Sequence, residues 1–248
     1  MKDSRNNNNL HGADRKKRLT KVLPGGGELK LVRTPDAEDH FLRAMDLRRG
    51  SETEKMDEDA AVELLMQGAR NGHRPSCAAL ALLCEGKVAE EDRQEYFDRA
   101  KGWIIQNAAA KDQWAALFQG VMYFDGMFAD QHYEKAAQFF QISADQGNSC
   151  AQGFLGYMYT TGQGVLKNRH TAVNYYRAAS EKGHVVAQFD LGVCYSQGRG
   201  VPKDKKEALK WFRMSADRGD VHAQAMLAKL YLTGNMVEID EKKAVHWF

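Results

Sequence analysis

The chain has 248 residues, of which 43% are hydrophobic, so it is long enough to bury a sizeable core. Its 35 lysines and arginines nearly balance 33 acidic residues, and the resulting net charge of +2 does not indicate a nucleic-acid or membrane-surface partner. No apolar run approaches the roughly 18 residues of a transmembrane helix, and the N-terminus lacks the apolar stretch of a secretory signal, so we expect a cytoplasmic protein.

Residues 1–33 contain an asparagine run, a basic cluster and a glycine run, with too few apolar side chains to offset the entropy cost of ordering. We therefore expect a disordered tail. The basic cluster consists of Arg15, Lys16, Lys17 and Arg18. It is compatible with a nuclear localisation signal, and hence with a nuclear location, but a solvated tail is the simpler interpretation.

Residues 34–50 are predicted to form a capping helix. The stretch begins with Thr-Pro-Asp, which is typical of a helix N-cap followed by a first-turn proline and a first-turn acid. It ends at a glycine, which is a common helix terminator. Its apolar residues Phe41, Leu42 and Met45 are expected to dock on the first repeat.

From residue 57 onwards the pattern becomes periodic, and from Ala151 it recurs every 36 residues. A fixed period of this size indicates a solenoid, in which each unit packs on its neighbours. Corresponding positions carry alanine, leucine, tyrosine, a turn glycine, a second alanine and an aromatic doublet. These residues are Ala151, Ala187 and Ala223; Leu155, Leu191 and Leu227; Tyr159, Tyr195 and Tyr231; Gly162, Gly198 and Gly234; Ala172, Ala208 and Ala244; Tyr175-Tyr176, Trp211-Phe212 and Trp247-Phe248.

The first half of each unit is predicted to be a helix. Ala151, Leu155 and Tyr159 share one helical face because they are four residues apart. Gly156 lies beside that face and, without a Cβ, would let a neighbouring helix approach closely. Gly162 follows the last periodic residue, where a left-handed C-cap favours glycine.

The second half of each unit is predicted to be another short helix, antiparallel to the first. It begins after Asn168, Asp204 or Asp240, whose side chains can cap free backbone N–H groups. Glu207, three residues after Asp204, completes a capping-box pattern. Each unit is therefore a helical hairpin that must stack on its neighbours to bury its apolar stripes.

The solenoid is expected to span residues 57–248. Residues 57–110 carry a degenerate form of the pattern. The complete units are 112–147, 148–183 and 184–219, and a truncated unit covers 220–248. Because the sequence stops inside a second helix, on two apolar residues where a terminal repeat would be polar, we expect it to be a fragment of a longer protein.

The recurring pattern resembles the Sel-1-like repeat, a relative of the tetratricopeptide repeat. The resemblance implies an all-α, right-handed α-solenoid of helix–turn–helix units that acts as a protein-interaction adaptor. Some bacterial relatives lock each hairpin with a disulfide, but the four cysteines here do not occupy a repeating pair of positions. We therefore expect free, buried thiols at Cys77, Cys84, Cys150 and Cys194.

The usual catalytic and cofactor motifs are missing from the sequence. The eight histidines show no metal-ligand spacing, and no C-x-x-C, G-x-S-x-G or Ser-x-x-Lys motif occurs. The two G-x-G pairs follow no strand and lack the lysine of a phosphate-binding loop, so they are interpreted as turns. Most aromatic residues fall on buried positions of the motif, which disfavours base stacking. We expect no enzyme activity, cofactor, metal, nucleic acid, membrane insertion or small-molecule substrate.

One surface is a candidate binding site. In the tetratricopeptide relatives, the first helix of each hairpin lines a concave groove. The resemblance therefore implies a partner-binding groove formed by Leu117, Val121, Phe124, Tyr157, Phe189, Val193 and Lys229. An exposed apolar stripe often marks an interaction site, but the same residues would also suit packing between adjacent repeats, and the sequence leaves both interpretations open.

Two functions follow from these features. The first is a non-catalytic scaffold or adaptor that binds a peptide or helix of an unidentified protein partner in the groove. The alternative is the regulatory repeat region of a larger enzyme or activator, whose catalytic part lies outside this chain.

Overall fold

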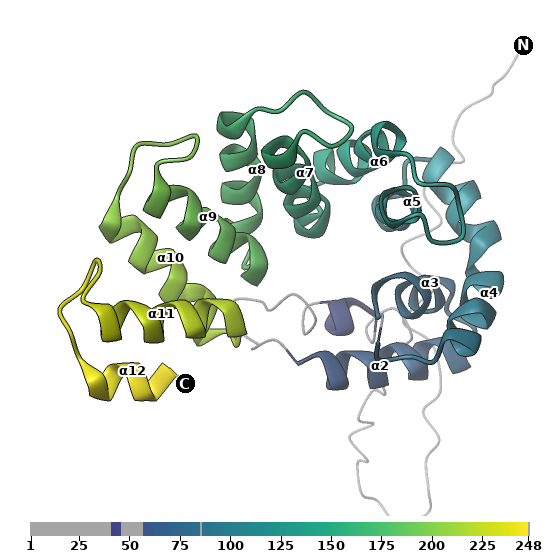
Figure 1. Ribbon diagram of the computed structural model, residues 1–248. Helices are drawn as coiled ribbons and strands as arrows, with labels where there is room; N and C mark the ends of the chain where they lie inside the picture. The colour runs from purple at the N-terminus through teal and green to yellow at the C-terminus, as the bar shows by residue number, and fades with distance from the viewer. Residues whose placement is uncertain (1–40, 46–56, 85, 248) are drawn as a thin grey trace, which may run out of the picture. The chain divides into compact units, whose positions relative to one another are not determined.

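The computed structural model describes residues 41–45, 57–84 and 86–247, and all regular secondary structure in these ranges is α-helical (Figure 1). The predicted tail at 1–33 with its basic cluster, and most of the predicted capping helix, lie outside the described residues. Residues 41–45 are helical. The helices that follow are α2 (Glu58–Arg70), α3 (Arg74–Leu83), α4 (Glu90–Ala109), α5 (Gln113–Asp125), α6 (Tyr133–Asp145), α7 (Ser149–Thr161), α8 (Arg169–Glu181), α9 (Val185–Gln197), α10 (Lys205–Asp217), α11 (Val221–Thr233) and α12 (Glu241–Trp247).

Consecutive helices pack as hairpins, and the hairpins stack on one another (Figure 1). We call the first helix of each hairpin an A helix (α3, α5, α7, α9 and α11) and the second a B helix (α4, α6, α8, α10 and α12). Each of the first four B helices also contacts the A helix of the next hairpin. This arrangement confirms the α-solenoid of helix–turn–helix units that the sequence predicts.

The predicted N-caps of the B helices are confirmed. The side chains of Asn168 and Asp204 each accept two backbone N–H groups, at 2.8–3.1 Å. The reciprocal half of the predicted capping box is wrong. The backbone N–H of Asp204 donates to the Tyr195 carbonyl at 3.0 Å, which joins the two helices of the hairpin. Glu207 instead accepts the indole N–H of Trp211 at 3.2 Å.

The repeat glycines have the two roles that the sequence predicts. Gly162 and Gly198 cap their A helices in the left-handed conformation, with φ of 87° and 71°. Inside the A helices, a Cβ at Gly156 or Gly192 would lie 2.6–2.7 Å from a ring carbon of the B-helix partner. Glycine at these positions therefore lets the two helices of a hairpin pack closely.

Leucine in place of Ala208 is expected to lower the free energy of unfolding by about 1–3 kcal/mol. Ala208 is fully buried, and its carbonyl lies 3.3 Å from where a Cβ on Gly192 would be, so α9 and α10 leave no room for a larger side chain. Urea denaturation followed by circular dichroism measures the loss. Ala225→Leu, at an exposed position of α11, is the matched control; equal midpoints for both variants would contradict the packing described.

Part of the predicted capping segment packs as expected. Phe41 is fully buried, with its ring centroid 5.0 Å from that of Trp114 and 5.6 Å from that of His73. Met45 is buried as well. Leu42 is exposed, so its expected docking is wrong: residues 41–45 present one face to the solenoid, and Leu42 lies off that face.

The four cysteines are buried and form no disulfide, as the sequence predicts: Cys77, Cys84, Cys150 and Cys194. Burial raises the pKa of the Cys77 thiol and brings that of Cys194 to about 11, which keeps both thiols protonated at neutral pH. Among the described helices, none has the length and apolar character needed to cross a membrane.

Candidate functional site

A hollow of about 380 Å³ opens along the A helices of neighbouring hairpins. We call it the A-helix groove. Its α7 residues form the middle, with contributions from α3, α5 and the start of α9. The lining consists of Leu83, Phe124, Cys150, Gly153, Phe154, Tyr157, His184, Val186, Ala187 and Asp190.

Aromatic contacts hold the apolar wall of the A-helix groove in place. The Phe124 ring meets Phe154 edge-on at a centroid distance of 5.5 Å and Tyr157 at 6.0 Å. Two apolar residues on this wall are unusually open to solvent, since Tyr157 is 45% exposed and Val186 is 48% exposed. Large apolar side chains exposed together in a hollow are typical of an interaction site.

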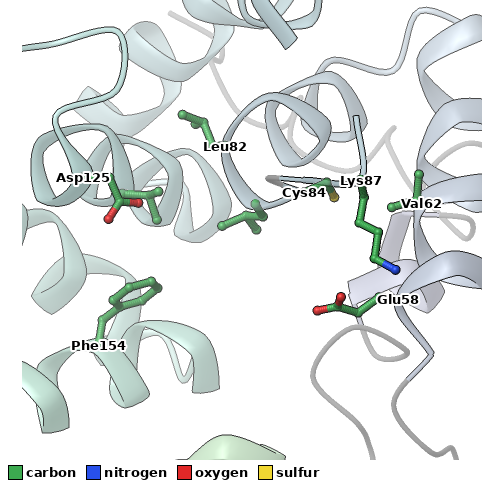
Figure 2. Close-up of a pocket in the computed structure, with 9 residues that line it drawn as sticks. Glu58, Val62, Leu82, Cys84, Lys87, Asp125 and Phe154 are labelled. Atoms are coloured by element: carbon green, nitrogen blue, oxygen red, sulfur yellow. The ribbon is translucent and has the colours of Figure 1, made fainter. Parts of the chain in front are cut away.

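A second pocket, of about 220 Å³, adjoins the groove because both are lined by Leu83 and Phe154. In Figure 2, Lys87 and Glu58 approach each other on one side of it, and Asp125 and Phe154 lie on the other. The Lys87 ammonium also forms a 2.7 Å ion pair with Asp59. The hollow surface therefore continues from the apolar groove toward a charged rim at α2.

Asp190 is the acidic residue in the groove lining. Its carboxyl group is partly buried and forms no side-chain hydrogen bond or ion pair with any residue of the described chain. Burial, and to a lesser degree the charge of Asp220, raises the pKa of Asp190 to about 7. Asp190 is therefore only partly ionised at neutral pH, and the described part of the chain does not compensate the charge that forms.

His184 borders the same end of the groove. Its Nδ1 accepts the backbone N–H of Ala187 at 3.2 Å and so caps α9. The ring lies over Gly153, where a Cβ would be 3.4 Å from its Cε1 atom.

The structure brings some of the predicted site residues together and separates others. Phe124 and Tyr157 line the A-helix groove. Leu117 and Val121 are buried in the core cluster that includes α3, because α3 packs against α5. The remaining three lie beyond the groove: Phe189 and Val193 are half-buried next to the α10–α11 core, and Lys229 is exposed on α11.

Sequence reasoning missed Asp190, although a signal for it exists. At the same position of the repeat, the neighbouring units carry Phe118, Phe154 and Met226. A carboxylate at a position that is otherwise apolar stands out once the units are aligned. In the described ranges, no three His, Cys, Asp or Glu side chains are grouped so that they could hold a metal ion.

The family comparison matches the repeats seen in the structure. A sequence model of the Sel1 repeat matches residues 115–148, 151–184, 185–220 and 221–248, which together exceed half of the chain. Each match begins in an A helix or next to its first residue, so the units found by sequence coincide with the hairpins.

Solved structures share the fold. A Sel1 repeat protein from Oxalobacter formigenes is 25% identical, with 87% of this chain and 86% of that chain covered and a TM-score of 0.59. A protective antigen of uropathogenic Escherichia coli strains with an SLR fold is 26% identical, with 86% and 44% covered and a TM-score of 0.56. An immunity protein of Pseudomonas aeruginosa is 18% identical, with 86% and 79% covered and a TM-score of 0.53, and shares the fold alone. The search of curated proteins gave no match.

Proposed function

The chain belongs to the Sel1 repeat family, and from this premise we propose that it is a scaffold that binds a peptide segment or helix of a partner protein in the A-helix groove. The Sel1 repeat fold is generally a non-catalytic protein-interaction scaffold. The observation that supports use of this groove is the pair of exposed apolar side chains, Tyr157 and Val186, on the wall of a hollow that spans neighbouring hairpins.

The mechanism requires shape and apolar burial only. A partner side chain that covers Tyr157 and Val186 removes apolar surface from water, which contributes roughly 1.5–3 kcal/mol for each well-buried anchor before ordering costs. The A helices are held by their B-helix partners, so their groove-facing side chains are already positioned. Little reorganisation of the solenoid is needed on binding.

We expect the double variant Tyr157→Lys, Val186→Glu to lose the partner while keeping the helical content of the parent chain. Both side chains are exposed, so charged replacements are tolerated by the fold but would be desolvated under a bound peptide. Phe189 is less suitable for this test, because its ring lies 5.7 Å from that of the core residue Phe212.

The measurement is quantitative mass spectrometry of proteins recovered from a cell extract by the immobilised full chain and its variants. The matched control is Leu166→Lys with Ile239→Glu, which makes the same kind of change at exposed positions outside the groove. A partner retained by this control and lost from the groove variant supports the proposal. Equal recovery by the groove variant and the parent chain would place the binding site elsewhere.

A further inference from the structure

The junction one repeat before Asp190 is filled by aromatic side chains. Phe124, Phe140 and Phe154 come from three successive helices, α5, α6 and α7. The rings of Phe140 and Phe154 stack with centroids 4.5 Å apart, and Phe124 meets Phe154 at 5.5 Å. Three aromatic rings thus fill the space between neighbouring hairpins.

One repeat later, all three positions carry a polar group. The residues 36 positions after the phenylalanines are Thr160, Tyr176 and Asp190. Burial, followed by the charge of Asp190, raises the pKa of the Tyr176 hydroxyl, so the hydroxyl and carboxyl groups are close enough to interact. Of the three aromatic rings, one is therefore retained at the next junction, with a hydroxyl group on it, and the other two are replaced by a threonine and an acid.

Stability does not explain this replacement. A carboxylate taken out of water needs a cation or several hydrogen bonds to offset its lost hydration. Asp190 has neither in the described part of the chain, and Asp220 adds like charge. The titratable groups that feel the charge of Asp190 are Tyr176 and Cys194, and neither side chain can carry a positive charge.

We propose that the α9 end of the A-helix groove binds a lysine or arginine side chain of the partner peptide, with an apolar residue of the same peptide lying against Phe124, Phe154 and Tyr157. This inference rests on the proposed function and specifies the chemistry of the partner. The ammonium or guanidinium group pairs with the Asp190 carboxylate, and the carbon stem of the basic side chain lies along the apolar wall.

Charge complementarity and the shape of the site favour a peptide as the occupant. The acid lies at one end of an apolar wall, so a basic residue next to an apolar residue matches both features at once. Val186, one helical turn before Asp190 on α9, is exposed beside it and extends the apolar contact. The binding preference should therefore be for a basic and an apolar residue together, not for positive charge alone.

The test uses the full chain and a phage-displayed library of random 12-residue peptides, selected at pH 8, where Asp190 is ionised. Three proteins are compared: the parent chain, Asp190→Asn, and Asp217→Asn, which makes the same substitution at an exposed position at the end of B helix α10. We expect the parent chain and Asp217→Asn to enrich peptides with lysine or arginine beside an apolar residue. Asp190→Asn should enrich apolar peptides without the basic residue.

A synthetic copy of the most enriched peptide then gives the affinities by fluorescence polarisation. Asp190→Asn should weaken binding roughly 10- to 100-fold, as expected for a charge-assisted hydrogen bond. Replacing the basic peptide residue with glutamine should cost a similar factor in the parent chain and little in Asp190→Asn. Such non-additivity places the two groups in direct contact.

The outcomes separate this inference from the proposed function. Enriched peptides without a basic preference, or an affinity unchanged in Asp190→Asn, overturn the inference while the groove remains a binding site. Selected peptides that bind the Tyr157→Lys, Val186→Glu variant as well as they bind the parent chain count against the groove itself. Absence of any enriched peptide with the parent chain would overturn both.

Discussion

The Gly200→Ala variant is expected to lose about 3 kcal/mol of unfolding free energy. Gly200 has a φ of +79°, a backbone conformation that L side chains rarely adopt. A Cβ there would overlap the backbone carbonyl of Arg169 and lie 2.6 Å from its carbon atom. Because both groups belong to the backbone, no side-chain rotation relieves the overlap.

The contact at Gly200 joins consecutive hairpins. Gly200 lies in the turn between α9 and α10, whereas Arg169 begins α8 of the preceding hairpin. Gly164 meets the carbonyl of Tyr133 in the same way one repeat earlier. In a solenoid, stability comes from contacts between neighbours as well as from each unit, so an overlap here weakens the coupling of two hairpins in addition to straining a turn.

Gly72→Ala provides the matched control for this prediction. Gly72 has nearly the same φ, +80°, but a Cβ there would meet no atom within 4 Å. The Gly72→Ala variant should therefore lose only the part of the unfolding free energy that comes from the backbone conformation, about 1 kcal/mol. Urea denaturation of the full chains, followed by circular dichroism at 222 nm as a far-ultraviolet probe, gives both values. Equal losses would show that the hairpins do not meet at Gly200.

The contact that the Gly200 turn makes with the preceding hairpin could not be predicted from the sequence. The corresponding positions in other units carry Phe128 and Met236, both with positive φ, so the sequence predicts a turn without a strict need for glycine. In the structure the Phe128 ring stacks on Phe97 with centroids 4.0 Å apart. The same position thus contacts the preceding hairpin by a side chain in one unit and by bare backbone in another.

Local features of the fold could be predicted because each depends on a few adjacent residues. The caps at Asn168 and Asp204, the left-handed Gly162 and the close approach at Gly156 all follow from residue type and spacing. The 36-residue period then predicts that the hairpins stack, since every unit must bury the same apolar stripes against its neighbours.

The candidate site was less predictable because it depends on contacts between helices that are distant in sequence. Leu117 and Val121 occupy repeat positions that the tetratricopeptide relatives expose, but α3 packs against α5 and buries both. Tyr157 holds the equivalent position of Val121 one repeat later and is 45% exposed. The 36-residue period alone cannot tell that Val121 is buried and that Tyr157 is exposed.

Asp190→Asn is expected to stabilise the free protein at pH 8 by about 2 kcal/mol and to have little effect near pH 4. Burial, and then the charge of Asp220, raises the pKa of Asp190 from its ordinary value of 3.8 to about 7 in the folded chain. Between these two values the unfolded chain has released its proton and the folded chain has not. Ionisation therefore disfavours folding progressively as the pH rises through this window, and the full cost is present above pH 7.

The amide of asparagine removes that cost because it does not ionise. The expected gain is smaller than the pKa difference alone would give, since Asp190 is only partly buried and water screens part of its charge. Urea denaturation of the parent chain and Asp190→Asn across pH 4–8 measures the difference at each pH. Asp217→Asn controls for the general change in net charge, and a difference that does not vary with pH would contradict a raised pKa at Asp190.

A bound basic peptide should stabilise the parent chain more than it stabilises Asp190→Asn, which is the opposite of the effect in the free protein. A ligand that binds only the folded state stabilises it in proportion to the logarithm of its concentration over Kd. The peptide pairs with the Asp190 carboxylate, so it should raise the unfolding midpoint of the parent chain more than that of Asp190→Asn at pH 8. A residue whose charge destabilises the free protein and strengthens its complex is retained for binding and not for folding. The opposite effects of the Asp190 charge on the free protein and on the complex therefore distinguish a carboxylate that recognises a ligand from a neutral substitution in the repeat.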